Sequence, residues 1–135
     1  MKKLFSTKWK ASSQPRKQRK YLYRAPKHVQ SKFLNAPLSK DMAKKHGLAK
    51  ARIIVGDKVK VMAGRFKGKE GKVELIDLKK SKSAISGIEV AKKDGSKSKP
   101  LIHASNLLII DAKADDKKRF KKKQPQASKI KIKQE

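Results

Sequence analysis

The residues best suited to binding chemistry stand close together in the middle of the chain. Three cations, Arg65, Lys67 and Lys69, are interspersed with glycines in the run GRFKGKEG that begins at residue 64. Lysine and arginine neutralise phosphate oxygens, and glycine permits positive φ and the close approach of another backbone. The spacing predicts a tight basic loop that binds phosphate groups, and the alternative is an ordinary surface loop in a small barrel.

Acid–base and metal chemistry have no comparable cluster in the sequence. The histidines are scattered over three segments, two of them rich in lysine, where a dication is repelled: His28, His46 and His103. Four acidic residues near the basic loop are expected to balance neighbouring lysines: Asp57, Glu70, Glu74 and Asp77. The chain has no cysteine, which rules out disulfides, thiolate metal sites and zinc fingers. The run from Gly64 also fails the P-loop spacing. We therefore predict no enzyme, no cofactor and no metal site.

Two short strands must position the basic loop. Apolar and polar residues alternate around Val59 and Val61 before it and around Val73 and Leu75 after it, which predicts strands near 57–62 and 71–77 with one buried face. Three more strands are expected near 84–90, 99–102 and 106–111, and Asp94-Gly95 has a turn signature. Short strands with glycine-marked turns favour a small closed barrel.

The residues before this region are strongly basic. Residues 1–25 lack apolar periodicity and contain the dense run Arg16-Lys17-Gln18-Arg19-Lys20, so alone in water this segment is expected to be disordered. Three aromatic residues are interleaved with these cations: Trp9, Tyr21 and Tyr23. Such residues either stack on bases of single-stranded or looped RNA or anchor the segment to the protein, and both interpretations remain open here.

Two short helices are predicted between this segment and the strands. The first spans about 26–35, begins at Pro26 and ends before Pro37. The second has Ser39 as N-cap, covers 40–46 and ends at Gly47. At the other end of the chain, residues 112–135 are of low complexity, and a helix over 117–123 is expected to start at Asp115 and Asp116.

The net charge of +28 over 135 residues requires a polyanion as partner. RNA, DNA and anionic membrane surfaces qualify, and binding to nucleic acid should weaken steeply with salt. A membrane is the weaker candidate, because no apolar run approaches the roughly 18–20 residues that span a bilayer. The first residues, MKKLFSTKWK, also lack the apolar core of a secretory signal.

The run GDKVKVMAGRFKGKEGKVELID at 56–77 resembles the KOW motif, a strand–loop–strand element of ribosomal proteins and transcription elongation factors. The signature glycine of the motif falls at Gly68, directly after Lys67. The flanking runs QPRKQRK (14–20), RAPKH (24–28), APLSK (36–40) and IHASN (102–106) are similar to the universal family twenty-four of large-subunit ribosomal proteins, called the twenty-sixth in eukaryotes. The similarity covers about residues 14–119 and is closest to the archaeal and eukaryotic branch. One departure is Ala104, where the family commonly has proline.

The resemblance implies a mainly β protein, with a small SH3-like barrel, the KOW domain, at 51–111. Basic, partly helical extensions are expected at 1–50 and 112–135. The resemblance further implies a structural constituent of the cytoplasmic large ribosomal subunit that binds rRNA near its 5′ region, supports assembly and lies near the peptide exit tunnel. The expected partners are rRNA and neighbouring ribosomal proteins, and no membrane partner is expected. A single copy of the protein per ribosome is expected. The expected RNA-binding residues are Arg16, Lys17, Arg19, Lys20, Arg24, Arg65, Phe66, Lys67, Gly68 and Lys69.

Two other functions fit part of the pattern. A KOW-type transcription elongation factor shares the motif, but it normally needs a second domain for polymerase, and 135 residues with basic ends leave little room for one. A basic DNA-compacting chromatin protein could also combine a small barrel with cationic tails. Neither alternative explains the flanking runs as well as the ribosomal family does.

Overall fold

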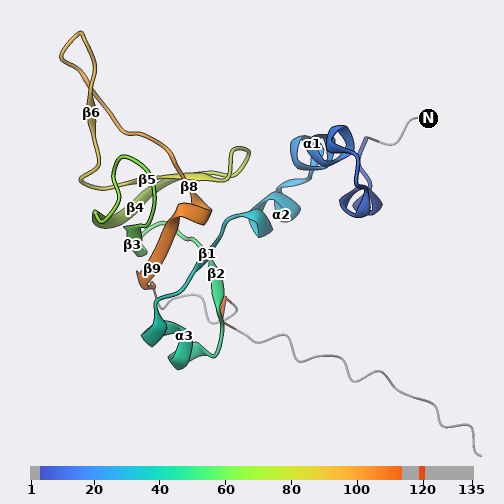
Figure 1. Ribbon diagram of the computed structural model, residues 1–135, viewed down its shortest axis with the longest axis horizontal. Coiled ribbons are helices and arrows are strands. Elements are labelled where there is room, and N and C mark those ends of the chain that lie inside the picture. Colours follow the sequence, from blue (N-terminus) through green and yellow to red (C-terminus); the bar gives the residue numbers. More distant parts are fainter. Residues whose placement is uncertain (1–3, 114–118, 121–135) are drawn as a thin grey trace, which may run out of the picture.

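The computed structural model describes residues 4–113 and 119–120 and shows a mixed fold dominated by short strands (Figure 1). Three helices and two 3-10 turns precede or separate the first strands: η1 Thr7–Ala11, α1 Pro15–Arg24, α2 Lys27–Gln30, η2 Ser31–Phe33 and α3 Lys40–His46. The strands are β1 Asn35–Pro37, β2 Lys50–Arg52, β3 Lys58–Val61, β4 Glu70–Asp77, β5 Lys82–Ile85, β6 Val90–Ala91, β7 Lys97–Ser98, β8 Ile102–His103 and β9 Leu107–Asp111, with η3 Ala104–Asn106 before the last.

The central element is a five-stranded antiparallel sheet in the order β8-β5-β4-β3-β9. The predicted strands near 57–62, 71–77 and 106–111 correspond to β3, β4 and β9. The expected strand at 84–90 is shorter and begins earlier, as β5, and the one at 99–102 is reduced to β8. Within the described residues no pairing joins β8 to β9, so the structure shows a small open β sheet rather than the closed barrel that was expected.

A glycine on β4 allows the end of β5 and the residue after it to lie very close to this strand. Gly71 on β4 lies opposite Val59 of β3, and a Cβ placed on it would clash with the backbone oxygen of Ser86 and with the side chain of Ile85. Any larger residue here must displace backbone, which is costly in a close-packed interior. The close backbone approach predicted for the glycine run therefore occurs at Gly71.

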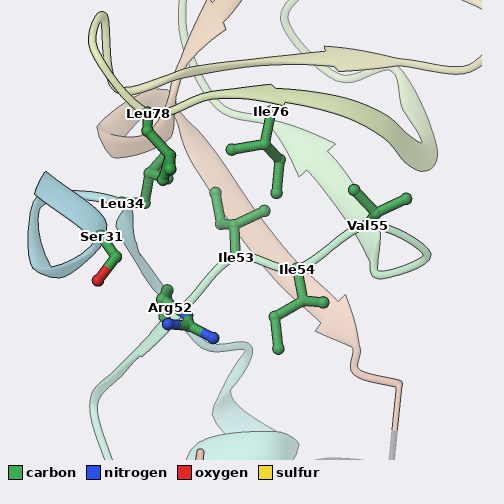
Figure 2. A pocket seen from close by; sticks show the side chains of 8 residues that line it. All are labelled: Ser31, Leu34, Arg52, Ile53, Ile54, Val55, Ile76 and Leu78. Atoms are coloured by element: carbon green, nitrogen blue, oxygen red, sulfur yellow. The ribbon is translucent and has the colours of Figure 1, made fainter. Parts of the chain in front are cut away.

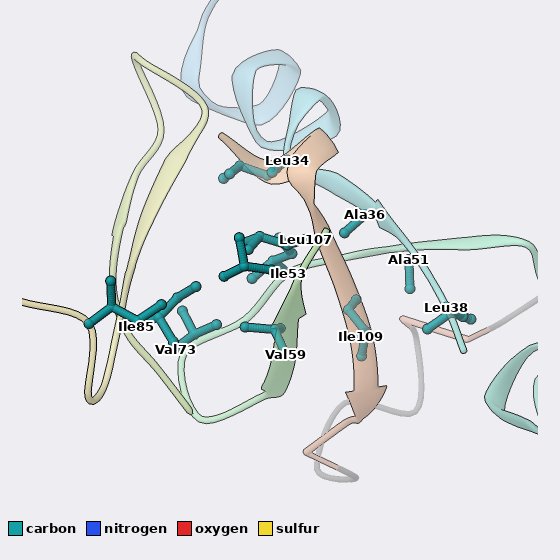
Figure 3. Close-up of a cluster of buried hydrophobic side chains, with 13 residues drawn as sticks. Leu34, Ala36, Leu38, Ala51, Ile53, Val59, Val73, Ile85, Leu107 and Ile109 are labelled. Atoms are coloured by element: carbon teal, nitrogen blue, oxygen red, sulfur yellow. The ribbon is translucent and has the colours of Figure 1, made fainter. Parts of the chain in front are cut away.

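The main core lies between the five-stranded sheet and the β1–β2 pair (Figure 3). Leu38 bridges to Ile109 of β9, and the amide of Ser39 donates to the Ile109 carbonyl over 2.8 Å. These contacts bring residues before α3 against the last strand. The buried side chains of this core are Leu34, Ala36, Leu38, Ala51, Ile53, Val59, Val61, Val73, Ile85, Ile88, Ala104, Leu107 and Ile109. Residues 34–38 thus contribute to the same core as the sheet.

The N-terminal segment contains a helix that the sequence analysis did not predict. Residues 15–24 form α1, and η1 packs beside it through Gln18, whose side-chain amide donates to the Lys10 and Ser12 carbonyls. Tyr21, Ala25 and Val29 are buried together, and three aromatic side chains pack around them: Phe5, Trp9 and Phe33. The expectation of disorder concerned residues 1–25 alone in water and stays a prediction. In the whole fold this segment packs through aromatic contacts that include Phe33, a residue beyond it.

The two short predicted helices differ in how well they match. The one beginning at Pro26 is shorter than expected: Pro26 is the N-cap of α2, and η2 replaces the last turn. The helix at 40–46 is confirmed as α3, with the Ser39 hydroxyl accepting from the Met42 amide and Gly47 left-handed at φ 62°. The Asp94-Gly95 turn is also confirmed, because it joins β6 to β7 with Gly95 at φ 79°.

The start of the C-terminal segment is attached to the sheet through Asp57. Its carboxylate is fully buried and accepts from the backbone amides of Ile54 and Lys113 and from both terminal nitrogens of Arg119. Phe120 stacks on His46 of α3 at 4.0 Å between ring centroids. Most of the helix expected at 117–123, with its start at Asp115 and Asp116, lies outside the described residues.

Candidate nucleic-acid interface

The loop between β3 and β4 is held in a fixed shape by backbone hydrogen bonds. The Gly68 amide donates to the Val61 carbonyl over 2.8 Å, and the Val61 amide donates to the Lys69 carbonyl over 2.9 Å. Gly64 and Gly68 have φ of +92° and +87°, a conformation that glycine adopts without a steric penalty. A Cβ at either position would meet nothing within 4 Å. The sequence thus specifies a tight turn whose glycine surfaces are open to a ligand.

The cations of the loop surround one aromatic ring. Phe66 is partly buried and packs against the main core, with the Arg65 guanidinium 5.8 Å and the Lys69 ammonium 5.7 Å from its ring centroid. Arg65, Lys67 and Lys69 themselves are exposed. In this geometry Phe66 fixes the loop to the core and supports the two cations through cation–π contacts, while the charged groups face solvent.

The turn that contains Ala104, next to the loop, is also held in place, although the family that the sequence resembles commonly has proline at this position. Ala104 is fully buried and its amide donates to the Ser81 carbonyl over 3.1 Å. His103 caps η3, because its Nδ1 accepts from the Ser105 amide. The Asn106 carbonyl accepts from the Met62 amide at the start of the loop over 2.8 Å. Hydrogen bonds therefore hold this turn without the ring of a proline.

A second basic surface lies on α1. Its five predicted contact residues are all exposed: Arg16, Lys17, Arg19, Lys20 and Arg24. Tyr21 on the same helix is 8% exposed and packs on Phe5 and Phe33. The Lys20 ammonium lies 4.7 Å from the centroid of the Trp9 ring. For Tyr21 and Trp9 the structure therefore supports the anchoring role that the sequence left open, whereas Tyr23 is 84% exposed.

The structure brings each set of predicted residues together but keeps the two sets apart. Figure 1 shows α1 and the β3–β4 loop on different sides of the molecule. A third group of exposed lysines was not predicted as a contact and lies on the β6–β7 hairpin: Lys92, Lys93 and Lys97. The pair of lysines directly before Asp94-Gly95 was the available signal, since a turn exposes the residues that flank it.

The acidic residues near the loop are paired rather than catalytic. Glu70 lies 3.6 Å from Lys58 and 3.4 Å from Lys60, and Glu74 forms an exposed hydrogen-bonded pair with Lys99. The hydrogen bond from Lys99 lowers the pKa of Glu74, and the same bond raises the pKa of Lys99. The prediction that neighbouring lysines balance the acidic residues is confirmed for Glu70 and Glu74. The prediction was wrong for Asp57, whose charged partner is Arg119.

One cavity beside the sheet is apolar and offers no phosphate site. It measures about 370 Å³ and opens between η2, β2 and the end of β4 (Figure 2). The side chains of Leu34, Ile53, Ile76 and Leu78 line it, and Arg52 is its charged residue. Over the described residues, no group of three or more histidine, cysteine or acidic side chains is placed to hold a metal ion.

Fold and site together define the class of a small, strongly basic β protein built around a strand–loop–strand element. The chain matches the profile of the eukaryotic ribosomal proteins L26 and their archaeal equivalents over residues 12–123. It is 54% identical to the large ribosomal subunit protein uL24 of Methanocella arvoryzae over 108 residues, which cover 80% of this chain and 87% of the relative. The uL24 proteins of Methanosarcina barkeri and Methanoregula boonei are 43% and 46% identical, over 80% and 82% of this chain and 93% and 92% of the relatives.

The chain belongs to this family of ribosomal proteins. The resemblance seen in the flanking runs is thereby confirmed, and the protein is a structural ribosomal constituent rather than an enzyme. In the part of the chain that the structure describes, no helix has the length and apolar character needed to cross a membrane.

Proposed function

We propose that the protein binds large-subunit rRNA through two separate basic surfaces, the β3–β4 loop and α1. The observation that carries this proposal is the rigid loop, in which positive-φ glycines leave open space beside three exposed cations. Phosphate contacts of this kind position a protein on folded RNA without reading its sequence. The names of its archaeal relatives as large-subunit proteins support rRNA as the polyanion.

The finer arrangement follows from the family and from the charge distribution. We infer that residues 51–111 act as the SH3-like KOW domain, with 1–50 and 112–135 as basic extensions that follow RNA crevices. A site near the 5′ region of the rRNA, close to the exit tunnel, and a role in assembly are part of the proposal. The proposal also includes neighbouring ribosomal proteins as partners, one copy of the protein per ribosome, and no membrane partner. The family match does not favour the elongation-factor and chromatin alternatives.

Charge reversal in the loop tests this function. The double variant Lys67→Glu/Lys69→Glu should bind a large-subunit rRNA fragment several kcal/mol more weakly, because attraction becomes repulsion. Filter binding or fluorescence anisotropy at fixed salt measures the loss. The matched control is Lys92→Glu/Lys93→Glu, which makes the same change in net charge on the β6–β7 hairpin.

If the loop itself contacts the RNA, the loop variant should lose clearly more rRNA affinity than the hairpin variant. Equal losses for both variants would show that net charge alone matters and would remove the loop from the proposal. Wild-type affinity for the loop variant would contradict it directly.

A further inference from the structure

A groove of about 640 Å³ lies between the α1–α2 junction and the end of β4. Tyr23 and Leu75, which are 84% and 55% exposed, both line it. They belong to the small set of large apolar side chains that the described part of the chain leaves exposed: Leu4, Leu22, Tyr23, Val55, Met62 and Leu75. An exposed aromatic ring beside apolar walls is the usual platform on which a nucleobase stacks.

The polar groups of the groove suit a nucleotide as well. Lys27 and Lys79 lie on its wall, are exposed, and have no ion-pair partner among the described residues. Gln30 also lines the groove. The amide of a glutamine can pair with the edge of a base.

Asp77 is the acidic residue in the groove. Its Oδ1 accepts from the backbone amides of Lys79 and Lys80 over 3.0 and 3.2 Å. The negative charge of Asp77 repels phosphate, but its carboxylate oxygens can accept a hydrogen bond from an amino group of a base. The charges therefore favour one orientation, with the base inside the groove and its phosphate outside, near Lys27 and Lys79.

We propose that this groove receives a single unpaired nucleotide of the rRNA, with the base stacked on Tyr23. The proposal rests on the rRNA binding proposed above and adds a site that reads an extruded base. It also assigns Tyr23 the stacking role that Tyr21 and Trp9 cannot take while they are packed in the aromatic cluster.

Binding of a large-subunit rRNA fragment to three single variants tests the groove. Tyr23→Ala should weaken binding at least about 5-fold, because stacking of one base contributes about 1–3 kcal/mol. Tyr23→Phe keeps the ring and should stay within about twofold of the wild type. Leu22→Ala is the matched control, since Leu22 is the adjacent exposed residue and lies outside this groove. Melting curves check that all three fold.

Ultraviolet crosslinking in purified large subunits identifies the occupant. A crosslink from Tyr23 to an unpaired rRNA nucleotide supports the proposal. A crosslink to another protein, or unchanged binding by Tyr23→Ala, overturns it. If Lys67→Glu/Lys69→Glu weakens binding while Tyr23→Ala does not, the proposed function stands and only the groove assignment fails. If the wild type does not bind rRNA, both fail.

Discussion

At the scale of single residues, the glycines of the β3–β4 hairpin have two distinct structural roles. Gly71 is required by its neighbours, since the Ser86 backbone oxygen occupies the space of a Cβ. Gly68 has open space around it but a φ of +87°. The first glycine therefore serves the fold, and the second serves the shape and accessibility of the loop.

Valine at the two positions should separate these roles. Gly71→Val is expected to destabilise the protein by at least about 3 kcal/mol through overpacking against backbone. Gly68→Val should cost only about 1–2 kcal/mol for its positive φ, yet it should bind rRNA poorly, because the side chain blocks close approach. Denaturant unfolding and RNA binding measure the two effects. Wild-type affinity for Gly68→Val would refute the role of an open loop surface.

The buried carboxylate of Asp57 should contribute more to the free energy of unfolding than an exposed acidic side chain does. Asp57→Asn is expected to lower the free energy of unfolding by about 3–5 kcal/mol, because the Arg119 guanidinium, 1% exposed, loses its charged partner. The control is Glu74→Gln, which removes an exposed pair with Lys99 and should change the melting temperature little, since water screens such pairs. Similar melting temperatures for both variants would contradict the structural importance of the buried pair.

At the scale of elements, the described residues form two apolar clusters, one in the sheet and one around α1. Tyr21, Ala25 and Val29 form the second cluster with aromatic residues from both sides of α1 in the sequence. A ten-residue helix is marginal by itself in water. The aromatic cluster therefore stabilises α1 and presents its cations on the outer face.

Removing the centre of that cluster should release α1 without unfolding the sheet. In Tyr21→Ala, amides of residues 15–24 should lose protection from hydrogen exchange, while those of β3, β4 and β9 keep theirs, because the two clusters are separate. Tyr23→Ala is the control, since Tyr23 is 84% exposed. Uniform loss of protection across the chain in Tyr21→Ala would show a single cooperative unit instead.

Local signals explain which elements could be predicted. Helix α3 was predicted with its bounds, because Ser39 and Gly47 mark its ends in the sequence itself. The β3–β4 hairpin was recognised from alternation and glycines, and its loop cations are exposed, while Phe66 is partly buried against the core. Helix α1 was missed, because Tyr21 is buried against aromatic residues that lie outside the helix, and the sequence does not show that these residues meet. The groove at Tyr23 joins segments about 50 residues apart, so only the fold could show it.

At the scale of the whole molecule, the charge of +28 sets how binding depends on salt. Plotted as log K against log salt concentration, rRNA affinity should fall linearly, with a slope proportional to the number of phosphates contacted. Lys67→Glu/Lys69→Glu should reduce the slope by about 1.4–1.8, since about 0.7–0.9 is lost for each of the two contacts. An unchanged slope over a titration from low to moderate salt would mean that these lysines touch no phosphate.

The Asp57–Arg119 pair also constrains when the protein can fold during its own synthesis. Asp57 is translated 62 residues before the guanidinium that neutralises it, so a nascent chain holds this acid without its counter-ion until Arg119 has been made. Burial of that carboxylate is unfavourable before then. The domain should consequently close only after Arg119 has been made, and shortened chains that stop before residue 119 should be the ones that misfold.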